Sequence, residues 1–334
     1  MKILKRLVIM LVLAFCFIGF VGCSKKDEKP TEEKKFEIGI LQLVTHGALD
    51  AARNGFIEGL KEAGLEEGKN INITVKNPEA DPTTMQQMAT ELVRKCDLVL
   101  GIATDAAIAL QTAAENEGKD LPILFTAVTD AVQANLVDSN EKPGHNVTGT
   151  SDINPVEAQI DLLKELLPEA KKFGIVYNIA EVNSKVQADA ASAQATKDGL
   201  ECIVKTVSEA SELGSAISNL LSLGIEALYL PTDNLVAKNI TVVVQACEEA
   251  KIPTICGEGS MVDAGGTITY GVNYTNLGKQ TAVMAKKILL DGVKPADIPV
   301  ESQPNEALDI SVNEEGLAAI GLTLPESIRS RMNK

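Results

Sequence analysis

The alternation of short apolar runs with helix-like segments constrains the fold of this chain more than any other feature of its sequence. In the first half, each apolar run has the length of a buried strand, and a helix-like segment follows it. Parallel strands need such crossovers, so this order predicts a doubly wound parallel sheet of the α/β class. The strand-like runs are Phe36–Val44, Ile71–Val75, Asp97–Ile102 and Ile123–Phe125. The helix-like segments are Ala48–Ala63, Asp81–Lys95 and Ala106–Glu115, the last capped by Thr104 or Asp105.

The same alternation starts again after Asp152, which predicts a second α/β lobe and a ligand cleft between the two. We expect lobe 1 to span 36–150 and lobe 2 to span 151–272. By analogy with bilobal binding proteins, a return helix within 273–292 should join lobe 1, and the tail 299–334 should join lobe 2. The later strand-like runs are Phe173–Tyr177, Leu200–Val207, Ala227–Leu230, Thr254–Cys256 and Thr267–Val272. The later helix-like segments are Asn154–Leu167, Glu181–Asp198, Ser211–Leu223, Leu235–Ala250 and Thr275–Leu290.

The stretch Leu121–Val137 predicts one wall of that cleft. Its apolar run is followed by Thr126, Thr129 and Asp130. Ligands of open α/β sheets bind beyond the carboxyl ends of the strands, so these three side chains should reach the rim of the cleft.

The amino terminus indicates export and lipid anchoring. Three positive residues precede Leu7–Gly22, which is almost wholly apolar yet shorter than a comfortable membrane span, and Cys23 follows directly. This pattern is typical of a bacterial lipoprotein signal peptide (1–22), with Cys23 carrying the lipid (palmitate) after cleavage. Residues 23–35 are almost free of apolar side chains and should be a solvated tether. The alternatives are an uncleaved anchor and a plain signal peptide with an incidental cysteine.

Composition restricts the partners. The net charge is −15, which disfavours nucleic acid. Only two histidines are present, so a metal site is poorly supported. The cysteines beyond the signal region lie in or beside apolar stretches, which favours buried free thiols over a disulfide framework: Cys96, Cys202, Cys247 and Cys256.

Seven segments of the chain form an ordered series: Gln42–Leu60, Gly101–Leu110, Leu124–Val132, Asn146–Asp152, Gly174–Ser184, Tyr229–Asn234 and Tyr270–Gly278. Together they closely resemble the ABC transporter substrate-binding lipoproteins of the tryptophan/tyrosine-binding type. The resemblance implies two Rossmann-like lobes of the type I periplasmic-binding kind, an extracytoplasmic place on the cell membrane, and delivery of an aromatic L-amino acid to a permease and its ATPase. We also expect a monomer without a cofactor or an enzymatic activity.

The chain departs from the family pattern at three predicted cleft loops. Glu-His-Pro is common in the family where this chain has Thr45-His46-Gly47, Thr-Pro-Ala where Thr104-Asp105-Ala106 stands, and Thr-Asp-Pro where Thr129-Asp130-Ala131 stands. These departures bear on the identity of the ligand more than on the fold.

An α-amino acid needs donors for its carboxylate, an acceptor for its ammonium group and walls for its side chain. Helix amino termini supply donors, and Asp233 is our candidate for the ammonium partner. Phe125 and Tyr274 are further candidates for aromatic walls. The predicted ligand-binding residues are Gln42, His46, Thr104, Thr126, Thr129, Asp130, Tyr177, Glu181, Asn183, Ser184, Asp233, Asn234, Tyr270 and Asn273.

Each of these residues has an ordinary structural alternative. Thr104, Ser184 and Asp233 are equally suited to capping helices, and Tyr177 to filling a core. Catalytic motifs are missing from the sequence: Gly257–Met261 lacks the last glycine of G-x-S-x-G, and there is no Walker loop. Two other functions stay open. One is binding of another solute, such as a different amino acid, a nucleoside or a sugar, although the absence of tryptophan weakens sugar stacking. The other is a surface receptor or adhesin.

Overall fold

Two six-stranded sheets form the framework of residues 35–332, the part of the chain that this computed structural model describes. The predicted signal peptide, Cys23 and all of the predicted tether except Lys35 lie outside the described residues. The first sheet has the order β11-β5-β4-β3-β1-β2, and all its strands are parallel. Its strands are β1 (Phe36–Gln42), β2 (Ile71–Lys76), β3 (Leu98–Ile102), β4 (Ile123–Val128), β5 (Val147–Ser151) and β11 (Glu301–Ser302).

The second sheet repeats this arrangement with the order β12-β10-β9-β8-β6-β7. Its strands are parallel except β12, which runs antiparallel to β10. The predicted class of two doubly wound α/β lobes is therefore confirmed, with one antiparallel edge strand added. The strands are β6 (Lys172–Asn178), β7 (Glu201–Val207), β8 (Ala227–Leu230), β9 (Thr254–Cys256), β10 (Ile268–Gly271) and β12 (Asp309–Val312).

Helices cover the sheets and bury one core in the first lobe and two hydrophobic clusters in the second. The helices of the first lobe are α2 (Gly47–Glu62), α3 (Pro82–Lys95), α4 (Thr104–Glu117) and α11 (Tyr274–Leu289), with the 3₁₀ turn η2 (Pro295–Asp297). Those of the second lobe are α5 (Val156–Leu166), α6 (Val182–Lys197), η1 (Ala210–Glu212), α7 (Leu213–Ser222), α8 (Asn234–Lys238), α9 (Ile240–Ala250), α10 (Gly259–Asp263), α12 (Glu314–Ala319) and α13 (Glu326–Arg329). The short turn η3 (Asn305–Ala307) precedes β12.

The stretch predicted as a buried strand forms β4, and all of its residues are buried. The strand extends past the apolar run to Val128, and its register with β5 shifts between Phe125 and Val128. Ala127 has a left-handed backbone, with φ 56°. This irregularity lies where the strand ends, and it carries the chain from the sheet into the cleft loop.

Three expectations from the sequence were wrong in detail. Neither Thr104 nor Asp105 caps α4, because the helix begins at Thr104 itself, after Ala103 turns the chain at φ 83°. The predicted helix Leu235–Ala250 is two helices, because Asn239 leaves helical geometry between α8 and α9. The start of the tail was placed with lobe 2, but β11 pairs with β5 in the first sheet.

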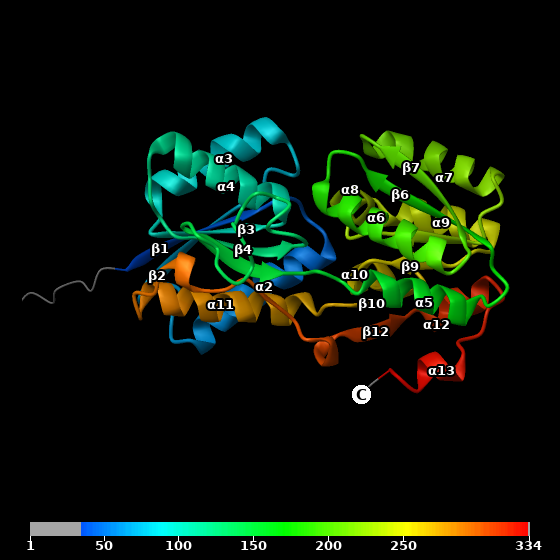
Figure 1. Cartoon of the computed structure of the whole chain (residues 1–334). Coiled ribbons are helices and arrows are strands. Elements are labelled where there is room, and N and C mark those ends of the chain that lie inside the picture. The colour runs from blue at the N-terminus through cyan, green and yellow to red at the C-terminus, as the bar shows by residue number, and fades with distance from the viewer. Residues whose placement is uncertain (1–34, 333–334) are drawn as a thin grey trace, which may run out of the picture. The chain divides into compact units, whose positions relative to one another are not determined.

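Glycines let α11 lie directly against α2, far from it in sequence (Figure 1). A Cβ at Gly278 would lie 2.1 Å from the carbonyl oxygen of Ala52 and 2.7 Å from the amide nitrogen of Phe56. Both are backbone atoms, so a side chain there would force the helices apart. This contact ties α11 to the first lobe although the chain has already passed through the second.

Gly278→Ala should therefore destabilise the protein by about 1–3 kcal/mol, against the gain that alanine normally brings inside a helix. Urea denaturation of the purified protein measures this. Gly214→Ala in α7 is the matched control, because its new Cβ would have no atom within 4 Å, and it should stabilise by about 0.5–1 kcal/mol. Equal effects of the two substitutions would contradict this account of the packing.

Candidate functional site

A small cavity, called the central cavity here, lies where the carboxyl ends of strands from both lobes meet. Its volume is about 10 Å³, room for about one water molecule. Five predicted ligand residues line it: His46, Thr129, Asn183, Asp233 and Asn234. The other lining residues are not among the predicted ligand-binding residues: Ala48, Leu49, Ala127, Asp152, Thr232, Ala237, Glu258, Met261 and Tyr274. For Tyr274 the sequence predicts only an aromatic wall.

The first lobe presents the uncapped start of α2 to the central cavity. His46 is the N-cap residue of this 16-residue helix, but its side chain makes no capping bond. The first intrahelical bond runs from the amide of Asp50 to the carbonyl of His46. The amides of Ala48 and Leu49 therefore have no acceptor within the helix, and both residues line the cavity. Such a helix start favours an anionic group.

The imidazole of His46 adds an acceptor beside these donors. Asn234 donates its Nδ2 to Glu181 at 2.7 Å, which leaves its Oδ1 to face Nε2 of His46 at 3.1 Å. Burial lowers the pKa of His46, so the neutral ring donates from Nε2 and keeps a lone pair on Nδ1. That Nδ1 is buried and has no hydrogen-bond partner among the described residues.

Three buried carboxylates line the rest of the cavity. Asp152 accepts hydrogen bonds from the hydroxyls of Thr129 (3.0 Å) and Tyr274 (2.7 Å). Asp233 accepts from the amides of Val236 and Asn178, and Glu258 from the amides of Ser260 and Met261. Within residues 35–332, no Lys or Arg side chain lines the cavity. This excess of buried negative charge favours a ligand with a cationic group.

Burial shifts the titration of these groups toward neutrality. It raises the pKa of Glu258 to about 7. Burial, helped by the nearby charge of Glu181, raises the pKa of Asp233 to about 7. Burial also raises the pKa of Asp152. The same burial, helped by the charge of Asp152, raises the pKa of Tyr274.

These shifts predict that the protein without ligand loses stability as the pH rises. Between the ordinary carboxyl range and about pH 7, the folded protein holds more protons on Asp233 and Glu258 than the unfolded chain does. Stability should therefore fall by roughly 1–3 kcal/mol from pH 5 to pH 8. Urea denaturation across this range measures it, and Glu258→Gln should flatten the dependence. A rise in stability over the same range would contradict the buried carboxylates.

Several side chains bridge the two lobes around the cavity. Besides the His46–Asn234 contact, Gln187 of α6 donates to the hydroxyl of Thr129 at 3.3 Å. Lys238 of α8 forms an ion pair with Glu79 at 2.6 Å. Burial, together with the like negative charge of Glu181 in the other lobe, raises the pKa of Asp105, at the start of α4, to about 6. Polar contacts between the lobes thus stabilise their close arrangement, whereas the like charges of Asp105 and Glu181 destabilise it.

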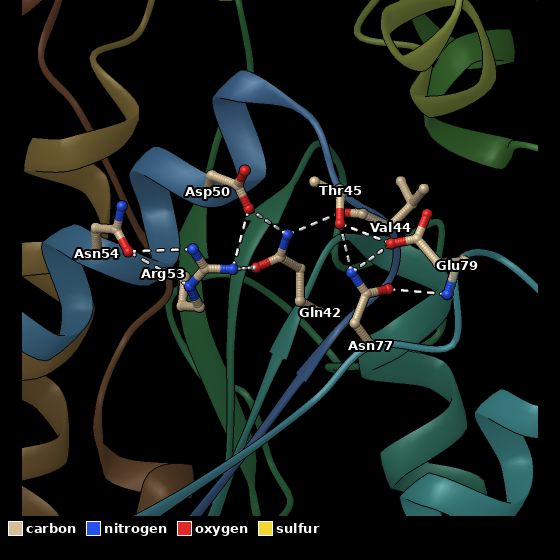
Figure 2. A network of polar contacts seen from close by, with 8 residues as sticks. All are labelled: Gln42, Val44, Thr45, Asp50, Arg53, Asn54, Asn77 and Glu79. Carbon is tan, nitrogen blue, oxygen red and sulfur yellow. Dashed lines mark hydrogen bonds and ion pairs between the residues drawn. The ribbon is translucent and has the colours of Figure 1, made fainter.

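A polar network stabilises the loops of the first lobe that face the second lobe (Figure 2). Gln42, at the end of β1, donates to Val44 and Asp50 and accepts from Arg53, all at 2.8 Å. The Glu79 carboxylate accepts from Thr45 at 2.6 Å and from Asn77 at 2.8 Å. Gln42 thus fixes the loop that leads into α2 and does not line the central cavity.

The structure places the remaining predicted residues outside the central cavity. Glu181, although buried, accepts from both amide groups of Asn234 and from the amide of Leu235, so it supports the cavity wall from behind. Ser184 is buried beside Asn183. Asp130 caps the turn at Val132, and Thr126 accepts from Thr150 within the first lobe.

The aromatic candidates divide between core and surface. Phe125 and Tyr177 are buried in the hydrophobic cores of the first and second lobes, and Tyr270 donates its hydroxyl to Asn305. Thr104 is buried, and its hydroxyl has no partner among the described residues. Asn273 caps α11 and lines a second cavity, described below. Among the described residues, Tyr274 is the one Phe, Tyr or Trp that lines the central cavity.

Residues 35–332 show few features of other kinds of site. No group of three or more His, Cys, Asp or Glu side chains could hold a metal ion there. No helix in the same range has the length and apolar character to cross a membrane. The four cysteines predicted as thiols are free, and Cys247 and Cys256 are buried.

A model of one protein family, described as ABC transporter substrate binding protein, matches residues 37–334. The tyrosine-binding protein of Clostridioides difficile is 41% identical over 310 residues, which cover 90% of this chain and 88% of that protein.

Two solved structures are also similar. One is an ABC domain in complex with L-Trp from Streptococcus pneumonia, with 35% identity, a TM-score of 0.84, and coverage of 90% of this chain and 99% of that one. The other is a ligand-free, open substrate-binding protein with adhesive properties from Clostridium difficile. It is 42% identical with a TM-score of 0.68, and the match covers 89% of this chain and 98% of that one.

Proposed function

Because the chain belongs to the ABC transporter substrate-binding proteins, we propose that it captures an aromatic L-amino acid (tryptophan, tyrosine or phenylalanine) for a permease. The observation that carries this proposal is the polarity of the central cavity. Its lining combines the open amides at the start of α2 with the buried carboxylates of Asp152, Asp233 and Glu258. A zwitterion matches this polarity, with its ammonium group among the carboxylates and its carboxylate at the helix start, where Ala48 also lines the larger cavity described below.

The relatives support the aromatic class of ligand. One is named for binding tyrosine, and another was solved with L-Trp. Within the proposal, His46, Thr129, Asn183, Asp233 and Asn234 keep the binding roles expected from the sequence. Asp233 also caps α8, so Asp152, whose partners are both hydroxyls of the cavity wall, is the stronger candidate for direct contact with the ammonium group.

Binding would proceed by closure of the two lobes. The chain is more similar in shape to the L-Trp complex than to the open, ligand-free relative, although its sequence is closer to the latter. This supports a fold whose lobes take more than one relative arrangement. Contacts made only when the lobes approach, such as Lys238–Glu79 and His46–Asn234, would favour the closed state that a permease recognises.

Isothermal titration of the purified protein with each of the twenty amino acids tests the proposal. We expect binding of at least one of Trp, Tyr or Phe, with release of protons as the ammonium group draws Asp233 and Glu258 into their charged forms. Titration in buffers of different ionisation enthalpy measures that release. If none of the twenty binds, the protein is not an amino-acid receptor. Binding of nucleosides or sugars instead would favour the other solutes considered above.

The lipid anchor is part of the same proposal and rests on the sequence around Cys23. Family membership implies an extracytoplasmic place, and a lipid on Cys23 would hold the protein, as a monomer, at the membrane where the permease lies. Cys23→Ala should move the protein from the membrane fraction into the soluble exported fraction. Unchanged fractionation would leave no role for that cysteine.

An adhesive role is a second candidate, favoured by one observation. A relative with 42% identity is described as a substrate-binding protein with adhesive properties. The two functions need different surfaces, so substitutions in the central cavity should abolish solute binding without reducing attachment to cells. Loss of both together would contradict separate surfaces.

A further inference from the structure

A larger cavity, called the lateral cavity here, adjoins the central one. Its volume is about 490 Å³, enough for an amino-acid side chain. The starts of α2 and α11 form two of its walls, α10 forms a third, and β10 and β12 form its floor. Ala48, Glu258 and Tyr274 line both cavities, so the two share a wall that contains one small side chain and one aromatic ring.

Residues of β10 and β12 that point to the same face of the sheet form the floor of the lateral cavity. Thr269 pairs with Ser311 and Gly271 pairs with Asp309, so these four small or polar residues share one face of the sheet. The residues between them pack on the opposite face against the hydrophobic core of the second lobe. The five-residue helix α10 covers the polar face only in part, which leaves the lateral cavity above it.

Thr269 carries a hydroxyl that the protein leaves unsatisfied. The residue is 1% exposed, and its Oγ1 has no hydrogen-bond partner among the described residues. A Cβ placed on Gly271 would lie 3.6 Å from this oxygen, so the hydroxyl points along the face that forms the floor. A buried hydroxyl without a partner is costly, and a polar group of a ligand would remove that cost.

Volume decides where the parts of an amino acid can go. The central cavity has room for a group of about the size of a water molecule, which an ammonium group matches and an aromatic ring exceeds. The lateral cavity, which adjoins the central cavity, is large enough for an aromatic ring. Tyr274 and Ala48 lie at the wall that the two cavities share. Asp263 and Asp309 also line the lateral cavity and would repel an acidic side chain.

We infer that the side chain of the bound amino acid occupies the lateral cavity, and that Thr269 hydrogen-bonds a polar group at the tip of an aromatic ring, so that the protein selects tyrosine over phenylalanine. This inference rests on the proposed function. A site that hydrogen-bonds a ligand hydroxyl discriminates strongly against the ligand that lacks it, because the buried partner is then left unpaired. Thr269 is thus a specificity-determining residue for the solute.

The test is titration of the wild type, Thr269→Val and Thr269→Ser with L-tyrosine and L-phenylalanine. We expect the wild type to bind tyrosine at least about tenfold more tightly than phenylalanine. Thr269→Val should remove this preference by weakening tyrosine alone, while Thr269→Ser should retain it. Phenylalanine is the internal control, because a general structural defect would weaken both ligands together. Valine has the shape of threonine and removes only the unsatisfied hydroxyl, so the variant should fold.

Several outcomes would overturn the inference. The wild type could lack a preference for tyrosine, Thr269→Val could leave the preference intact, or it could weaken both ligands equally. L-Lysine is titrated as well, because Asp263 and Asp309 would also attract a cationic tip, and tighter binding of lysine than of tyrosine would show that charge selects the ligand. If the wild type binds no amino acid at all, the proposed function itself fails, which differs from binding without selectivity at Thr269.

Discussion

Replacing Asp152 with asparagine should weaken amino-acid binding by about 2–5 kcal/mol, between roughly 30-fold and several-thousand-fold in Kd. The two oxygens of Asp152 accept hydrogen bonds from Thr129 and Tyr274, and both hydroxyls belong to the wall of the central cavity. A ligand ammonium group placed there would meet a buried carboxylate with no Lys or Arg among the cavity residues to compete. The amide of asparagine keeps the shape but carries no charge, so the loss should fall on binding.

The fold should tolerate this substitution, which makes the result easy to interpret. An asparagine oxygen can accept from Tyr274, and its amide nitrogen can donate to the hydroxyl of Thr129. Burial raises the pKa of Asp152, so the protein without ligand gains from removal of the charge. We expect unchanged or higher stability in urea denaturation together with weaker binding in titration calorimetry.

Asp130→Asn is the matched control for Asp152→Asn. Asp130, unlike Asp152, is a ligand residue predicted from the sequence. It follows the neighbouring strand β4, caps a turn and does not line the central cavity. Its replacement should change Kd by less than about threefold, a difference of under 1 kcal/mol. Equal losses for the two variants would show that net charge near the cleft matters and that no direct contact with Asp152 exists.

Local signals in the sequence were sufficient for most of the framework. The runs Ala227–Leu230 and Thr254–Cys256 form strands with the predicted bounds, because each is a short apolar run between residues that end regular structure. The edge strands β11 and β12 carry no comparable run, because an edge strand needs less apolar surface than a central one. Their placement depends on pairing with β5 and β10, which only the folded chain provides.

The site was predictable as a region but not as a set of residues. Residues from several loops after the strands line the central cavity, because a parallel sheet brings the carboxyl ends of its strands to one edge. Asp152 and Glu258 were missed, since acidic residues are common and only burial distinguishes these two. Tyr177 was given a ligand role because it is aromatic, but its strand directs it into the hydrophobic core of the second lobe. An acidic residue directly after a strand, as Asp152 follows β5, is the sequence signal that could have been used.

Gly47→Ala should weaken ligand binding by about 1–3 kcal/mol, because it obstructs the approach of the lobes. Gly47 begins α2 in the first lobe, and a Cβ there would lie 2.5 Å from Cβ of Ser260 in α10 of the second lobe. Cβ atoms essentially never come within 3.0 Å of another heavy atom, so the lobes would have to stay further apart. Ala48 and Leu49, which line the central cavity, would then lie further from Asp233 and Glu258 of the second lobe.

The expected loss of ligand affinity arises from hindered closure of the lobes. A second substitution can demonstrate this. Ser260→Gly removes the atoms that Gly47→Ala would strike, so the double variant should recover most of the lost affinity. The interaction energy in this double-mutant cycle should be at least about 1 kcal/mol. Ser260→Gly alone is the control for the two bonds that Ser260 donates to Glu258, from its amide and from its hydroxyl, of which only the second is lost.

Small-angle X-ray scattering with and without the bound amino acid separates closure from contact. The wild type should contract when ligand is added, whereas Gly47→Ala should contract less at saturation, and the double variant should behave like the wild type. If Gly47→Ala binds as tightly as the wild type, the contact between α2 and α10 does not limit closure. If affinity falls but Ser260→Gly does not restore it, the alanine acts on the start of α2 itself, through the amides proposed to hold the ligand carboxylate.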